Sequence, residues 1–255
     1  MTDRLECLKQ FALTPSAGKR LIARAMLKHP AVMPVLHKGT LVIVAGTTNG
    51  YVAEEVLKSL GQLEGFSRRG FRRGVVLGPG KDEANPLFPG DVVIVDGVWQ
   101  KGKQIFDVAQ KLECGDVILK GANAFELETG RCAVLIGHPQ AGTASAAIAA
   151  AAGRRVALIC PVGLEKRVSM GIDDIAELLN SSVAQGPRML ALPARAFCEL
   201  DAISLLSGAS AELAAGGGIM GAEGSSWIAV FGGIEQVESA QRQIEQVMAE
   251  PPCQA

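Results

Sequence analysis

A strand, a polar turn and a helix near the start of the chain constrain its fold most strongly. Residues 41–45 form an apolar run typical of a buried strand, and apolar residues recur with helical spacing over residues 52–57. The turn between them consists of Gly46, Thr47, Thr48, Asn49 and Gly50. A strand that enters a helix through such a turn predicts an α/β unit whose free backbone N–H groups point at an anion.

The turn suits a phosphate or carboxylate ligand, because its threonines and asparagine add side-chain donors and no carboxylate occurs before Glu54. It is neither a Walker loop nor a GxGxxG fingerprint, because the lysine and the glycine spacing that define them are missing. The alternative is an ordinary strand-to-helix turn in which a threonine or the asparagine caps the helix. Both interpretations remain open at this point.

Composition limits the class of protein and its partners. The chain has 255 residues, of which 48% are hydrophobic and 20% charged, so it can bury the core of one large or two modest domains. Aromatic residues make up only 4%, which disfavours platforms for base stacking. The net charge of −1 predicts no nucleic-acid or anionic-membrane partner. We expect a small-molecule ligand and a homo-oligomer.

Cysteine spacing and the N-terminal sequence bear on metal binding and location. The six cysteines include no CxxC pair and the three histidines are not spaced as metal ligands, so we expect neither a metal site nor a bound cofactor. The first ten residues contain no apolar signal core, and no apolar run is long enough to span a bilayer. These features predict a cytoplasmic protein.

Short apolar strands alternate with helices through the first two thirds of the chain. This order predicts an α/β fold, with a Rossmann-like, mostly parallel sheet covered by helices on both faces. The expected strands are residues 41–45, 91–95, 116–119, 133–137 and 155–160, and the expected helices are residues 15–27, 104–112 and 145–152.

The pattern changes after Pro161. A βαββα order predicts a small C-terminal α+β domain of ferredoxin-like type. Its elements are residues 188–192, 197–206, 209–215, 226–231 and 234–248, preceded by a short helix at 172–179. We therefore expect a Rossmann-like ligand-binding domain over residues 1–165, a connecting segment over 166–186 and the small domain over 187–250. The glycine-rich segment 216–224 is either a mobile hairpin tip or a loop that closes over a ligand or another subunit.

Four polar turns follow expected strands of the main sheet. Ligands of open parallel sheets bind beyond the carboxyl ends of the strands, so four such turns on one edge predict a site. The turns are Gly46-Thr47-Thr48-Asn49, Asp96-Gly97, Lys120-Gly121-Ala122-Asn123, and Gly137-His138 continuing to Gly142-Thr143.

The order of these turns resembles the superfamily of ribose-5-phosphate isomerase, glucosamine-6-phosphate deaminase, the CoA transferases and the effector domains of sugar-responsive repressors. AGTTNGYVAEEV is similar to the isomerase phosphate loop, IVDGV to its Asp-Gly-Ala-Asp-Glu segment and ILKGANA to its Lys-Gly-Gly-Gly loop. The resemblance covers residues 40–160 and is weaker beyond, where it implies a small ferredoxin-like domain.

The resemblance implies roles for particular residues. Gly46–Asn49 would hold a phosphate, Lys120 would stabilise an enediolate, and Asp96, Glu126 or Glu128 would move the proton. Only Asp96 matches the isomerase acids, because Val98 and Trp99 follow Gly97, and neither glutamate has the usual spacing. The alternatives are a strand-end lysine that reaches solvent, a turn aspartate and solvated helical glutamates.

Other polar residues are weaker candidates. Asn123 could orient a ligand or occupy a turn, and His138 could contact a ligand from its strand end. The basic cluster at residues 68–73 could reach a polyanion such as a nucleotide or CoA, or it could be a solvated loop.

We therefore expect the chain to bind a phosphorylated small molecule and to catalyse sugar-phosphate isomerisation by proton transfer. One alternative is a non-catalytic sensor or binding protein of the same fold, which the missing acids after Gly97 favour. Another is a CoA transferase-like or acyl-CoA-binding protein, in which Glu126 or Glu128 would be the nucleophile.

Overall fold

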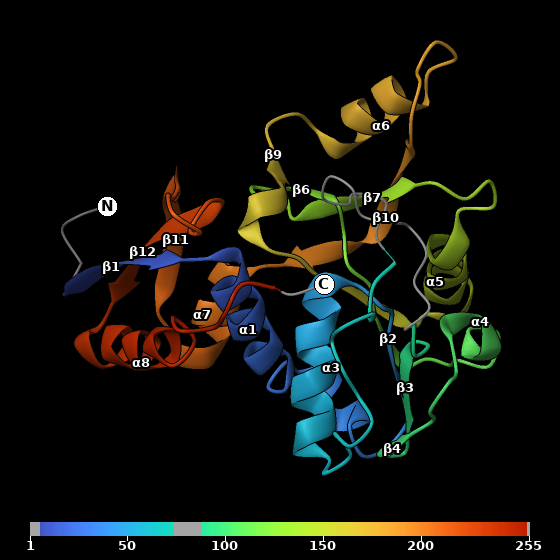
Figure 1. Cartoon of the computed structure of the whole chain (residues 1–255), viewed down its shortest axis with the longest axis horizontal. Helices are drawn as coiled ribbons and strands as arrows, with labels where there is room; N and C mark the ends of the chain where they lie inside the picture. The colour runs from blue at the N-terminus through green and yellow to red at the C-terminus, as the bar shows by residue number, and fades with distance from the viewer. Residues whose placement is uncertain (1–5, 74–87, 254–255) are drawn as a thin grey trace.

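Two β-sheets organise the chain (Figure 1), and the computed structural model describes residues 6–73 and 88–253. The larger sheet has nine strands in the order β4-β3-β2-β5-β8-β10-β7-β6-β9, and the smaller has three in the order β1-β12-β11. The protein is thus an α/β protein with a mixed large sheet and a small antiparallel sheet that draws strands from both ends of the chain.

The centre of the large sheet is parallel, as the sequence predicts. It consists of β2 (Thr40–Ile43), β5 (Val117–Leu119) and β8 (Ala157–Pro161), which pair in register along their lengths. The last residues of β10 (Arg188–Phe197) extend this parallel part beside β8. These strands bring several carboxyl ends to one edge.

The rest of the large sheet is mixed, so the expectation of a mostly parallel sheet is wrong. Antiparallel pairs join β2 to β3, β3 to β4, β10 to β7 and β7 to β6, whereas β6 and β9 are parallel. Connections of a few residues between β3 and β4 and between β6 and β7 are too short for a parallel crossover. The strands are β3 (Val92–Val95), β4 (Val98–Trp99), β6 (Ala124–Glu126), β7 (Arg131–Ile136) and β9 (Arg167–Val168).

Helices cover both faces of the parallel strands, as expected. Alternate residues of β2 point to opposite faces: Leu41 and Ile43 pack in the core beneath α1 (Pro15–Met26) and α3 (Thr47–Ser59). Val42 packs on the other face against α4 (Ile105–Val108) and α5 (Gly142–Arg154). Three further helical segments are α2 (Val32–Val35), η2 (Leu164–Lys166) and α6 (Ile172–Asn180).

The small sheet differs from the expected C-terminal unit. Residues 188–192 belong to β10 of the large sheet, where they pair with β7, and the N-terminal β1 (Cys7–Leu13) pairs instead with β12 (Ser225–Gly232). Two helices, α7 (Glu199–Ser207) and α8 (Ile234–Glu245), and the strand β11 (Ser210–Gly217) complete this part. Pairing between segments more than two hundred residues apart leaves no local signal in the sequence.

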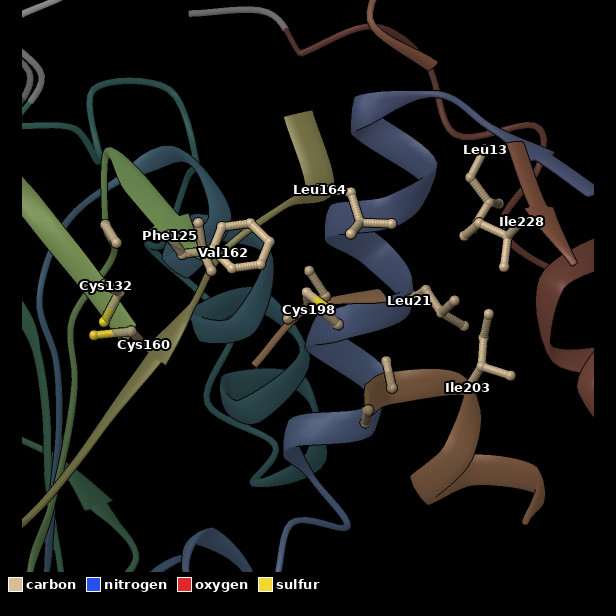
Figure 2. Close-up of a cluster of buried hydrophobic side chains, with 14 of the residues drawn as sticks. Leu13, Leu21, Phe125, Cys132, Cys160, Val162, Leu164, Cys198, Ile203 and Ile228 are labelled. Atoms are coloured by element: carbon tan, nitrogen blue, oxygen red, sulfur yellow. The ribbon is translucent and has the colours of Figure 1, made fainter. Parts of the chain in front are cut away.

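One apolar core joins the two sheets across α1. Figure 2 shows Leu21 of α1 between Ile203 and Ile228 on the side of the small sheet and Val162 on the side of the large one. All four side chains are buried in the same cluster. The two sheets therefore pack through shared helices.

A buried carboxylate lies at the junction of the two parts. Glu199, the first residue of α7, accepts a hydrogen bond from the Leu164 backbone N–H at 2.9 Å. Its burial, together with the nearby charge of Glu165, raises the pKa of Glu199 to about 7, although Lys19 opposes the shift. Lys19 itself pairs with Glu165 at 2.6 Å.

Glu199 predicts an unusual pH dependence of stability. Between its ordinary value of 4.5 and the folded value of about 7, the folded state keeps a proton that the unfolded state releases. The free energy of unfolding should therefore fall as the pH rises through this window, by up to about 3 kcal/mol. Glu199→Gln should remove this fall, measured as urea unfolding at pH 5 and pH 8. Glu177→Gln, exposed on α6, is the control, and a parallel pH slope in wild type and Glu199→Gln would contradict the prediction.

Candidate functional site

A cavity of about 1070 Å³ opens at the carboxyl edge of the parallel strands. Three of the four predicted turns line it, namely those at residues 46–49, 120–123 and 137–143. The β6–β7 side of the sheet adds Val134, Leu135 and Ile136. The tertiary structure thus gathers residues from several separate parts of the sequence.

The first wall is the N-terminus of α3. Its N-cap, Gly46, has no side chain and an extended φ of 172°, and no other side chain caps the helix. The first turn contains no acid, so its backbone N–H groups and the positive end of the helix dipole face the cavity uncompensated. Thr47 is exposed there, whereas Thr48 is only 3% exposed and its Oγ1 has no hydrogen-bond partner among the described residues.

The N-terminus of α5 forms a second wall of the same kind. Its N-cap, Ala141, and its first residue, Gly142, both have left-handed φ values, 59° and 51°. No side chain caps this helix and its first turn holds no acid. Thr143, in the first turn of this helix, also lines the cavity.

Lys120 lies between the two helix N-termini. It follows β5 directly and is 9% exposed, and its Nζ donates to the Thr143 hydroxyl at 3.2 Å. No carboxylate forms an ion pair with this ammonium among the described residues. Burial lowers the pKa of Lys120, because desolvation disfavours the charged form. An anion in the cavity would supply the missing partner.

Asn49 and Asn123 act mainly on the backbone around the cavity. The Asn49 amide donates to the Val44 and Leu119 carbonyls at 2.7 and 3.0 Å, so it connects the ends of β2 and β5. The Asn123 side-chain oxygen accepts from the Leu135 N–H at 3.0 Å. Both residues line the cavity, and both hold the turns in place.

Gly121 lines the cavity, but Gly50 does not. Gly50 is buried in the first turn of α3 and donates its N–H to the Gly46 carbonyl at 2.8 Å. His138 is exposed at the cavity rim, where its Nδ1 accepts from the Gln140 N–H at 3.1 Å.

Three further charged residues lie at the site, and the sequence did not predict two of them, Lys166 and Asp91, as site residues. Lys166 lines the cavity and donates to the Ala122 carbonyl at 2.9 Å, and burial lowers its pKa. Arg73, from the basic cluster, also lines it. The buried Asp91 accepts from the N–H groups of Ala45 and Ile105 at 2.9 and 2.8 Å and pairs with Arg73 at 3.3 Å. An aspartate directly before an apolar strand was the available signal for this last residue.

The arginines of the basic cluster at residues 68–73 have different positions: some line the cavity and one packs against α3. Arg72 lines the cavity with Arg73, whereas Arg68 stacks 4.0 Å above the Tyr51 ring and pairs with Glu54 and Glu250. Arg68 therefore belongs to the packing of α3, whereas Arg72 and Arg73 belong to the cavity.

The described lining of the cavity is positively charged. It contains four cationic side chains and one histidine, and no aspartate or glutamate occurs among the described lining residues. These side chains are Arg72, Arg73, Lys120, Lys166 and His138. Together with two helix N-termini, they favour an anion.

Asp96 lies at the opposite edge of the sheet. Because β3 runs antiparallel to β2, its end pairs with the start of β2, and Asp96 Oδ1 accepts from the Gly39 N–H at 2.8 Å. Asp96 and Gly97 have φ values of 48° and 81° and form the two-residue turn between β3 and β4. Asp-Gly between apolar runs is a strong hairpin signal that the grouping of four turns overlooked.

The two candidate glutamates also lie outside the cavity. Glu126 belongs to β6, where it accepts hydrogen bonds from Thr129 and from the Ile172 N–H at the start of α6, and these bonds lower its pKa. Glu128, in the turn after β6, lines a different cavity of about 750 Å³ beside Arg195. The short β6–β7 hairpin takes both side chains away from Lys120.

Comparison of the chain with protein-family models, with curated proteins and with solved structures finds no match in any of the three. The resemblance to the isomerase superfamily therefore stays a prediction. Within the part of the chain that the structure describes, no cluster of three His, Cys, Asp or Glu residues could hold a metal ion. No helix there has the length and apolar character needed to cross a membrane.

The two hydrogen bonds of the Asn49 amide can be tested by their effect on stability. Asn49→Ala removes both hydrogen bonds to buried strand ends and should lower the free energy of unfolding by about 2–3 kcal/mol. Thr47→Ala, two residues earlier and exposed, should change it by less than about 0.5 kcal/mol. Urea denaturation measures both variants. Equal stability of Asn49→Ala and wild type would mean that the two bonds do not hold β2 to β5.

Proposed function

We propose that the protein binds a phosphorylated small molecule in the large cavity. The turns that follow β2 and β5 and the N-terminus of α5 line this cavity. A Rossmann-like fold of the ribose-5-phosphate isomerase and CoA transferase type is part of this proposal. The observation that carries it is Lys120, a nearly buried ammonium that forms no ion pair among the described residues and lies between two uncapped helix N-termini. A buried cation is costly unless an anion compensates it.

Phosphate is the anion that this arrangement favours. Its oxygens can accept several backbone N–H groups at a helix N-terminus while a lysine and an arginine balance the charge. Lys166 and Arg73 add such groups, and a cavity of about 1070 Å³ leaves room for the rest of a metabolite.

Sugar-phosphate isomerisation is a second candidate, supported by Lys120. A desolvated ammonium can stabilise the charge of an enediolate oxygen. The proton-moving carboxylates are missing from the described lining, however, since Asp96, Glu126 and Glu128 all lie elsewhere. This absence favours the binding or sensor alternative over the isomerase. The same placement removes the support for Glu126 or Glu128 as a CoA transferase nucleophile.

Lys120→Met tests the proposal in a thermal-shift screen against pentose phosphates, hexose phosphates, nucleotides, acyl-CoAs and inorganic phosphate. A compound at 100 times its Kd should stabilise the wild type by about 2.7 kcal/mol. The variant should lose most of this stabilisation while its ligand-free Tm stays equal or rises, because it no longer buries an unpaired charge.

Lys111→Met, which removes an exposed lysine, should behave as the wild type. Product analysis of any stabilising sugar phosphate then separates the candidates, since binding without conversion supports the sensor. The proposal fails if no phosphorylated compound stabilises the wild type, or if Lys120→Met responds as strongly as Lys111→Met.

A further inference from the structure

The geometry points to a ligand with two anionic groups, one bound at the N-terminus of α3 and the other at the N-terminus of α5. Lys120 lies between the two groups. This inference rests on the proposed function and specifies the class of ligand: a small molecule with two phosphoryl groups on one backbone.

The N-termini of α3 and α5 differ from those of the other long helices because they lack both a side-chain cap and an acid in the first turn. Among the described helices of nine or more residues, α1 is capped by Thr14, and α6, α7 and α8 each carry an acid in the first turn. Only α3 and α5, of 13 residues each, have neither a side-chain cap nor an acid. Both lie at one cavity, so their positive ends add there.

Buried polar groups at the two ends also support the inference. At α3, the Thr48 Oγ1 is buried and has no partner among the described residues, although the residue lines the cavity. At α5, the Lys120 Nζ has three donors, and its one described hydrogen bond goes to Thr143. A buried donor without a partner is costly, so each end has a group that a bound anion would satisfy.

Two hydrogen bonds also place Lys120 between the two helix N-termini. The carbonyl of its neighbour Leu119 accepts from Asn49 in the first turn of α3, whereas its own Nζ reaches Thr143 in the first turn of α5. The lysine backbone is thus fixed beside one helix and its side chain beside the other. The cavity volume of about 1070 Å³ is at the upper end for small-molecule sites, which suits an extended ligand.

Two matched substitutions test each end separately. Thr47→Asp places a carboxylate in the first turn of α3, and Ser145→Asp places one in the first turn of α5; both positions are exposed and line the cavity. A carboxylate near a helix N-terminus stabilises the helix, so neither variant should unfold. Ser204→Asp, exposed on α7 away from the cavity, adds the same charge as a control.

Calorimetric titrations would compare fructose 1,6-bisphosphate, ribulose 1,5-bisphosphate and hexane-1,6-diol bisphosphate with the corresponding monophosphates. We expect at least one bisphosphate to bind ten times or more tightly than its monophosphate. Thr47→Asp and Ser145→Asp should each weaken that bisphosphate at least tenfold, with an unchanged or higher ligand-free Tm, and Ser204→Asp should not.

The inference is overturned if every bisphosphate binds within twofold of its monophosphate, or if either aspartate at the cavity leaves the affinity unchanged. In both cases, binding of a monophosphate to the wild type would still support the proposed function, with one anion site in the cavity. If no mono- or bisphosphate binds the wild type, both the inference and the proposed function fail.

Discussion

The amide of Asn49 is the contact on which the site depends. Its two hydrogen bonds, to the carbonyls of Val44 and Leu119, join the ends of two adjacent parallel strands at the point where their loops diverge. One loop becomes the N-terminus of α3, and the other begins with Lys120. Because the donor sits in the helix that it anchors, strand spacing, helix position and lysine position are fixed together. The buried Asp91 adds a second brace by joining the end of β2 to the start of α4.

The described lining of the cavity holds cationic side chains and no aspartate or glutamate. The ion pairs of the described residues lie elsewhere: Arg20 joins Glu54, Glu55 and Glu250 between α1, α3 and the C-terminal segment. At the cavity, Arg73 pairs with Asp91 at 3.3 Å. Desolvation lowers the pKa values of Lys120 and Lys166, and the nearby acids offset this effect only in part: Asp91 for Lys120, and Glu165 and Glu199 for Lys166. An anionic ligand would raise both pKa values and stabilise the folded state.

Several parts of the fold and site could be predicted because their signals are local. The apolar runs of β2, β5 and β8 and the periodicity of α1 and α8 predict those elements within a few residues. The prediction that Asp96 lies at the site is wrong because it treats β3 as parallel to β2. The Asp-Gly turn after β3 is a hairpin signal and indicates the antiparallel direction. Glu126 and Glu128 were misplaced because the three-residue β6 has no clear strand pattern. The expected C-terminal unit has the wrong strands because β12 pairs with β1, which lies near the other end of the sequence.

The sequence by itself determined the local units of this protein: a glycine turn without acids that opens α3, and a lysine at the end of a short apolar strand. These depend on neighbouring residues and on helix and strand periodicity. Only the tertiary structure decided which turns share a cavity, because sheet order and strand direction follow from the packing of distant segments. It placed α5 beside Lys120, removed the three candidate carboxylates and left a cationic lining. Charge balance at a site is a property of what the fold brings together.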